Sequence, residues 1–190
     1  MEENKMDDKT RMFDLKNMVL MALFAALTCV LAPLAVPIGP VPISLTNLVI
    51  YFSVFVLGWQ RATITYIVYL LLGMAGLPVF SGFEGGIGKI AGPTGGYLVG
   101  FILMAIICGL FIQRKTEKAW LKYLFDFIGM VLGTVVAYAF GTAWFCFSTG
   151  TGLWAALLVC VFPFILGDLA KIVLSFLVAP PVAKQVAKIG

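Results

Sequence analysis

Two charged residues interrupt an otherwise apolar segment near the end of the chain. The segment reads "FPFILGDLAKIVLSFLVAPP", and within it Lys171 follows Asp168 by three residues. Residues three apart on a helix share a face, so both side chains should point toward one cavity or one neighbouring helix. A carboxylate acceptor beside an ammonium donor can bind a polar ligand. The alternative is a self-satisfied ion pair that locks this helix to its neighbours.

A glycine-rich segment supplies a second group of candidate ligand-binding residues. The stretch "LPVFSGFEGGIGKIAGPTGG" ends at Gly96 and is too irregular for a spanning helix, so we expect a folded outer loop or a plug within the protein. Thr94 is a candidate N-cap of the next helix, where Gly95 and Gly96 would offer N–H groups to an anion. A row of small residues four apart instead favours close helix packing. That row is Gly92, Gly96 and Gly100.

Composition indicates the environment in which these residues act. Of the 190 residues, 62% are hydrophobic and only 12% are charged, which leaves too little polar surface for a soluble globule. An isolated Asp168 or Lys171 at the centre of a membrane span would cost about 2.5 to 3.5 kcal/mol on insertion scales, so a partner or ligand must offset that cost. The chain has no histidine, and its cysteines are scattered singly. We therefore expect no catalytic residue, no metal site and no cofactor.

The apolar segments predict an all-α membrane protein with a bundle of six transmembrane helices and the Gly-rich outer loop between helices 3 and 4. Residues 1–16 would form a cytoplasmic N-terminal lead and residues 186–190 a cytoplasmic tail, with a substrate-binding domain over 17–185. The predicted spans lie at about 17–36, 44–58, 62–80, 93–113, 120–147 and 153–179.

The last span has two possible arrangements. Pro163 suits the first turn of a helix, which would make residues 153–162 a separate cap. Alternatively, one long helix is kinked at Pro163. For the helix that begins at Pro163, Pro180 and Pro181 are expected to mark the end.

Charge distribution predicts the orientation of the chain. If both termini lie in the cytoplasm, all but two of the 13 Lys and Arg residues fall on that side, as the positive-inside rule requires. This asymmetry accounts for the net charge of +4 without a nucleic-acid partner. The two exceptions, Lys89 in the glycine-rich loop and Lys171, become candidates for ligand binding.

Three motifs together resemble the BioY family, the biotin-binding S components of energy-coupling factor importers. They are "GLPVF" at 76–80, "GPTGGYLVGF" at 92–101 and "PFILGDLAK" at 163–171. The resemblance covers roughly residues 13–185 and implies a prokaryotic cell-membrane subunit that captures biotin near the outer face. It also implies a transmembrane T component and two cytoplasmic ATPase subunits as partners, with ATP hydrolysed only by those subunits. By resemblance, Asp168 and Lys171 match the polar ligand contacts, and residues 82–97 match the substrate cover.

The chemistry of biotin suggests further site residues. The ureido ring of biotin has a carbonyl acceptor and two N–H donors, which complement Lys171 and Asp168. Its apolar edge would suit Tyr51, Phe83 and Tyr97, and its carboxylate would suit Lys89 or the N-terminus of the helix after Thr94.

One segment departs from the family pattern. After "VPI" the family usually has threonine-leucine-glutamine, whereas this chain reads "SLTN". Ser44, Thr46 and Asn47 are therefore alternative ligand contacts, of which we favour Asn47.

The first apolar segment carries a candidate docking face. Ala22 and Ala26 form an A-x-x-x-A step supported by Ala25, and small residues let two helix backbones approach closely in lipid. S components are similar in using such a face to dock on the T component. The alternative is that these alanines pack inside the bundle.

Two other functions compete with this interpretation. A stand-alone ion-coupled secondary transporter would usually show an internal repeat, and the "GPTGGY" motif has no counterpart in residues 100–190. An S component for a different small vitamin would share the fold and differ in the ligand.

Overall fold

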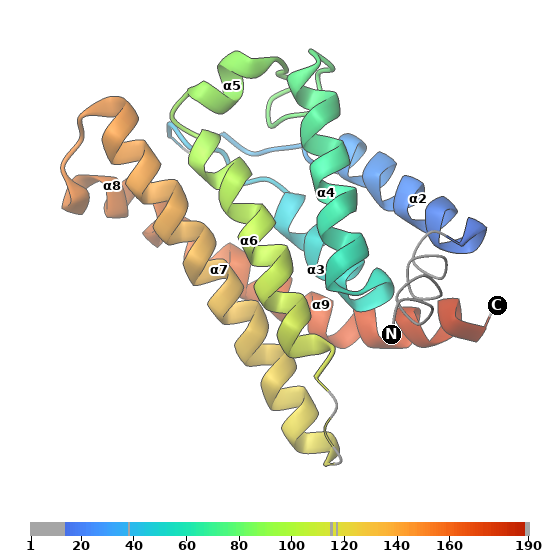
Figure 1. Cartoon of the computed structure of the whole chain (residues 1–190). Coiled ribbons are helices and arrows are strands. Elements are labelled where there is room, and N and C mark those ends of the chain that lie inside the picture. Colours follow the sequence, from blue (N-terminus) through green and yellow to red (C-terminus); the bar gives the residue numbers. More distant parts are fainter. Residues whose placement is uncertain (1–13, 38, 115, 117, 189–190) are drawn as a thin grey trace, which may run out of the picture.

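The computed structural model describes residues 14–37, 39–114, 116 and 118–188, and it is built from helices (Figure 1). In chain order they are α2 (Leu15–Leu31), α3 (Thr46–Leu57), α4 (Trp59–Met74), α5 (Ile87–Ala91), α6 (Gly95–Ile112), α7 (Ala119–Thr149), α8 (Leu153–Cys160) and α9 (Phe162–Lys188).

Each predicted apolar segment contains a helix, the last of them both α8 and most of α9, and the helices differ in length. Among the described residues, α6, α7 and α9 are long and apolar enough to span a membrane. The helices α2 and α3 are apolar but shorter. With 12 residues, α3 is roughly 18 Å long at 1.5 Å per residue, and its first two residues, Thr46 and Asn47, are buried.

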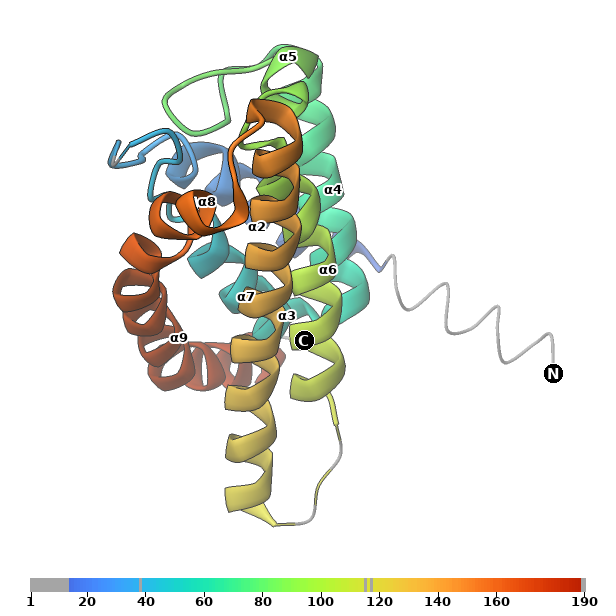
Figure 2. The same cartoon turned by 90° about the vertical axis from the view of Figure 1, so that its left-hand side faces the viewer.

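The tightest helix pair is α6 with α7, which lie side by side in both views (Figures 1 and 2). Glycine makes this approach possible. A Cβ atom on Gly96 would collide with the Trp144 side chain, and one on Gly100 would lie 3.2 Å from Phe140 Cβ. Gly133 on α7 faces Met104 and Cys108 of α6 in the same way. Lipid supplies no hydrophobic driving force between helices, so the close packing that small residues allow is a main source of helix association.

The C-terminal region begins as predicted but does not end as predicted. Residues 153–160 form the separate helix α8, and α9 starts at Phe162 with Pro163 in its first turn. The expected stop at Pro180 and Pro181 is wrong, because α9 continues through both prolines to Lys188. Proline removes a backbone donor and bends a helix, yet membrane helices tolerate it where neighbouring groups satisfy the freed carbonyls. Figure 2 shows α9 as a curved helix beside α7.

The glycine-rich segment forms a folded cover over one end of the bundle, where it holds the short helix α5 (Figure 1). Several hydrogen bonds anchor it. The Tyr69 hydroxyl of α4 donates to Val79 O at 3.1 Å, and Gly82 N donates to Pro33 O at 3.1 Å. Trp144 Nε1 of α7 donates to Gly92 O at 2.9 Å. The fully buried Phe80 packs against Gly73, so the cover is attached to the core rather than free above it.

Candidate functional site

Asp168 is the centre of a buried polar cluster that joins three helices. Its Oδ1 accepts hydrogen bonds from Asn47 Nδ2 of α3 at 2.8 Å and from Lys171 Nζ at 2.9 Å. Its Oδ2 accepts from the Tyr138 hydroxyl of α7 at 2.5 Å. The Asp168 residue is only 6% exposed, and a buried carboxylate requires such partners to offset its lost hydration.

Lys171 is equally well satisfied, and Asn47 links it to the carboxylate a second time. Besides Asp168, the ammonium donates to Ser44 O at 2.7 Å and to Asn47 Oδ1 at 3.0 Å, which uses all three of its protons. Asn47 therefore donates to the anion and accepts from the cation. The predicted i, i+3 pair does form an ion pair, and it is also tied to α3 and α7.

This cluster forms part of the wall of a cavity beneath the glycine-rich cover. The polar lining residues are Ser44, Thr46, Asn47, Ser81, Lys89, Thr94, Thr134, Tyr138, Asp168 and Lys171. The apolar and aromatic lining residues are Val41, Pro42, Phe80, Tyr97, Leu98, Phe101, Met104, Ala137 and Phe164. Such a mixed wall suits a small ligand with hydrogen-bonding groups at one end and an apolar body.

The structure brings most of the predicted ligand-binding residues to this cavity. These are Asp168, Lys171, Asn47, Lys89, Thr94 and Tyr97. Of the alternatives in the "SLTN" segment, Ser44 and Thr46 line the cavity as well, and their hydroxyl groups are joined at 2.9 Å. Lys89 forms a salt bridge with Glu84 at 3.0 Å within the cover. The Tyr97 hydroxyl donates to Cys160 O at 2.7 Å, which fixes its ring at the edge of the cavity.

Four predicted residues lie elsewhere. Gly95 and Gly96 serve helix packing, since the Gly95 amide already donates to Gly92 O at 3.0 Å and both positions lack room for a Cβ atom. Tyr51 is fully buried behind the wall, where its hydroxyl pairs with that of Thr134 at 2.5 Å. Phe83 is 63% exposed on the cover and has a φ angle of +59°. These four are therefore not cavity-lining residues.

Thr94 occupies the predicted N-cap position of α6 without the predicted capping bond. Its backbone is helical, and its side chain makes no capping hydrogen bond. Thr94 nevertheless lines the cavity. The anion site expected from the free amides of this helix start is not supported at Gly95, because that amide is engaged.

Sequence reasoning missed Tyr138, Phe80 and Phe101. Tyr138 lies 30 positions before Asp168 in an apolar helix, so no local spacing connects the two residues. A tyrosine within the apolar fifth span, whose hydroxyl would need a partner when buried, was the available signal. Phe80 and Phe101 lie within the quoted "GLPVF" and "GPTGGYLVGF" motifs and could have been assigned as aromatic lining from their position.

The candidate docking alanines separate into two environments. Ala22 and Ala26 are exposed on the outer face of α2, whereas Ala25 is 7% exposed and packs inside the bundle. The buried position excludes Ala25 from a surface that a partner could contact. The expected A-x-x-x-A step itself remains available.

Comparisons with known proteins agree with one another. Residues 4–188 match the model of the BioY family. The chain is 38% identical over 165 residues to "Biotin transporter BioY" of Thermotoga maritima, a match that covers 87% of this chain and 94% of that protein. It is 36% identical over 164 residues to "Probable biotin transporter BioY" of Pyrococcus horikoshii, with 86% and 94% covered.

A solved structure has a similar fold. It is the 2.1 Å crystal structure of the S-component for biotin from an ECF-type ABC transporter, which superposes with a TM-score of 0.81 at 28% sequence identity. The superposition covers 90% of this chain and 92% of that one.

Proposed function

The chain belongs to the BioY family, and on that premise we propose that it binds biotin as the S component of an energy-coupling factor transporter. It is a multi-pass membrane protein and a non-enzymatic binding subunit. The observation that carries the ligand assignment is the cluster of Asp168, Lys171, Asn47 and Tyr138 in the wall of a partly apolar cavity.

Biotin supplies groups that match this cluster. Its two ureido N–H groups can donate to Asp168, and its ureido carbonyl can accept from Lys171 or Tyr138. Because these side chains are already paired with one another, binding exchanges internal hydrogen bonds for ligand hydrogen bonds. An analogue that lacks the ureido groups would leave buried polar atoms unpaired, which is the basis of strong discrimination.

The other cavity-lining residues suit the fused ring and the valerate chain of biotin. Phe80, Phe101 and Tyr97 provide apolar surface for the fused ring. Lys89 provides a cation for the valerate carboxylate at the edge of the cavity. The salt bridge from Lys89 to Glu84 would then compete with the carboxylate of the ligand.

The proposal also includes the orientation and the partners. Six helices cross the membrane with both termini in the cytoplasm, so the glycine-rich cover faces outward. A T component docks on the exposed Ala22 and Ala26 face, and two cytoplasmic ATPases hydrolyse the ATP. The absence of a nucleotide-binding motif in this sequence supports that division of labour.

Titration calorimetry on the purified chain tests the ligand assignment. We expect heat with biotin at a ratio near one to one, and no comparable heat with thiamine or riboflavin. Absence of heat and of thermal stabilisation with biotin would contradict the proposal. Binding of a different vitamin would keep the assignment as an S component and would show that its ligand is not biotin. Ion-driven biotin uptake by proteoliposomes containing only this chain would favour a secondary transporter.

A further inference from the structure

A second cavity of about 520 Å³ lies at the end of the bundle opposite to the biotin site. The biotin site lies by the starts of α3 and α6, whereas this cavity lies where both helices end, next to the first turns of α4 and α7 and the bent part of α9. The function proposed above does not use it.

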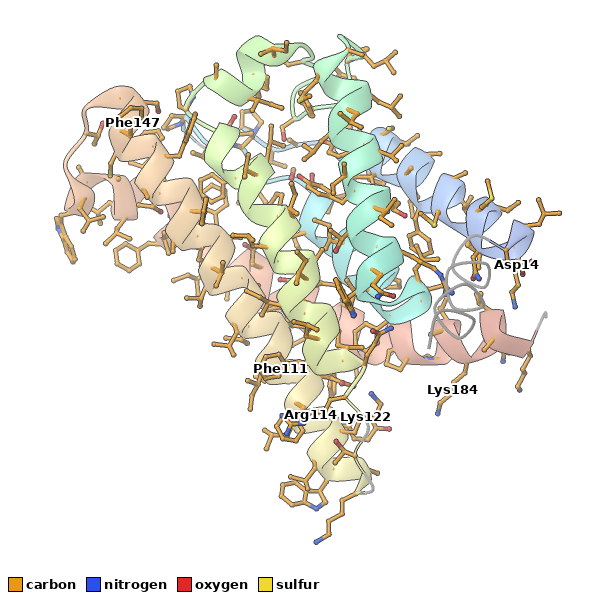
Figure 3. The ribbon with its side chains drawn as sticks, in the orientation of Figure 1. Asp14, Phe111, Arg114, Lys122, Phe147 and Lys184 are labelled. Carbon is orange, nitrogen blue, oxygen red and sulfur yellow. The ribbon has the colours of Figure 1, made fainter. Side chains whose placement is uncertain are left out.

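Basic side chains line this cavity. Arg61, Lys122 and Lys184 contribute three positive charges from α4, α7 and α9, and Asp126 contributes one negative charge. The described lining is therefore positive by two charges. Figure 3 shows Lys122 and Lys184 at the same end of the bundle.

Lys122 has a structural role. Lys122 Nζ contacts both carboxylate oxygens of Asp126 at 3.2 Å and donates to Ile112 O, at the end of α6, at 3.0 Å. Asp126 is only 2% exposed and has its charge balanced by Lys122, while the bond from Lys122 to Ile112 O joins α7 to the end of α6. Arg61 Nη1 donates to Leu57 O at 3.5 Å, and Lys184 is exposed at the rim.

The rest of the wall is apolar. Phe55, Leu57, Tyr123 and Pro180 line the same cavity. The Tyr123 ring is also held against Phe176 of α9, with ring centroids 5.7 Å apart, so the apolar side is ordered by packing between α7 and α9. A charged rim above an apolar wall matches a molecule with an anionic head and a hydrocarbon body.

We propose that this cavity binds an anionic phospholipid, with Arg61 and Lys184 on the phosphodiester and the apolar wall against the first part of an acyl chain. Basic pockets between transmembrane helices on the cytoplasmic side bind anionic head groups, and each cation near the membrane surface contributes to that attraction. The apolar wall favours a lipid over a soluble phosphate. Assignment to the inner leaflet rests on the orientation proposed above, whereas the lining residues do not depend on it.

Native mass spectrometry of the delipidated full chain, titrated with phosphatidylglycerol or phosphatidylcholine, tests this proposal. We expect one phosphatidylglycerol adduct that survives activation, and clearly weaker retention of phosphatidylcholine. Arg61→Gln and Lys184→Gln should each weaken the adduct by about fivefold, the effect of one surface cation. Lys188→Gln is the matched control, because it removes a charge one helical turn away that does not line the cavity. Lys122 is left intact because its loss would leave the buried Asp126 without its ion-pair partner.

Three results would contradict the proposal. Equal retention of the two lipids would overturn the proposal, because it would mean that the charge of the head group does not select the lipid. An equal effect of Lys188→Gln and Lys184→Gln would overturn the site in favour of general surface charge. Thermal stabilisation by inorganic phosphate alone, equal to that by phosphatidylglycerol, would overturn the lipid assignment. Biotin binding by every variant is measured in parallel. A variant that still binds biotin is folded. If the unmodified chain does not bind biotin, that result contradicts the proposed function and leaves the proposal for this cavity unaffected.

Discussion

At the scale of single residues, the site depends on one carboxylate that orders three donors from three helices. Asp168 receives Asn47 from α3, Lys171 from its own helix and Tyr138 from α7. In a medium of low dielectric, such a network is stabilising only when every member is satisfied. The same network that accommodates a buried charge therefore also fixes the positions of the groups offered to a ligand.

Asp168→Asn should reduce biotin affinity more than it reduces folding stability. The substitution removes the charge that balances Lys171 and replaces one acceptor oxygen with a donor group. We expect a loss of about 1.5 to 3 kcal/mol in binding free energy, as for a hydrogen bond to a charged group, or more if Lys171 stays buried and unpaired. Calorimetry and thermal unfolding measure the two effects. Asp14→Asn, at an exposed carboxylate, should change neither. Normal biotin binding by a folded Asp168→Asn variant would make Asp168 a structural residue.

Tyr138→Phe should weaken biotin binding by a smaller amount than Asp168→Asn. It removes the only donor that the structure assigns to Oδ2 within the described part of the chain, but it leaves the ion pair intact. The matched control is Tyr123→Phe on the same helix, whose ring contact with Phe176 is retained. Equal binding by both variants would remove Tyr138 from the site.

At the scale of helices, glycine determines how closely α6 and α7 pack and therefore where the cavity wall stands. Tyr97 and Thr94 begin α6, and Tyr138 projects from α7, so any change in helix separation moves the lining on both sides. Trp144 of α7 also links this α6–α7 contact to the cover, because its Nε1 donates a hydrogen bond to Gly92 O. The small-residue row that was ambiguous in the sequence has a packing role at Gly96 and Gly100.

Gly96→Ala should destabilise the protein and also weaken biotin binding. The added methyl group meets the Trp144 side chain and lies 2.8 Å from Phe140 O, a backbone atom that cannot easily move. Overpacking of this kind costs typically about 1 to 3 kcal/mol. Gly88→Ala provides the contrast, because no atom lies within 4 Å of its added Cβ. In thermal unfolding in detergent, Gly96→Ala should have the lower unfolding temperature of the two variants. Equal unfolding temperatures would show that the contact between α6 and α7 can adjust to the added methyl group.

At the scale of the whole molecule, the proposed ligand site and the proposed docking face are different surfaces. The proposed biotin site lies between α3, α6, α7 and α9, whereas Ala22 and Ala26 lie on the exposed face of α2. In Figure 1, α2 lies at one edge of the bundle and α8 at the other. Because Ala22 and Ala26 are exposed rather than buried, bulk can be added there without disturbing the core.

Replacing both Ala22 and Ala26 with Leu should abolish assembly with a T component and its ATPases and leave biotin binding unchanged. Larger side chains hold two helix backbones apart and remove the dispersion gained at close contact, while leucine remains compatible with lipid. Co-purification measures assembly, and calorimetry on the isolated subunit measures binding. Exposed Leu23→Ala on the same helix is the control and should assemble normally. Normal assembly of the double variant would refute this docking face, and loss of binding as well would place the alanines in internal packing.

Composition and local pattern were sufficient for much of this molecule, because both depend on neighbours in the chain. The apolar runs predicted where the helices lie, Pro163 marked the first turn of α9, and the spacing of Asp168 and Lys171 predicted a shared helix face. Tertiary structure decided the rest. The partnership of Tyr138 with Asp168 depends on how α7 packs beside α9, and no spacing along one helix contains that information. The continuation of α9 through Pro180 likewise depends on neighbouring groups, which can satisfy the backbone carbonyls that lose their donor at proline. The burial of Ala25 depends on which face of α2 packs against the other helices.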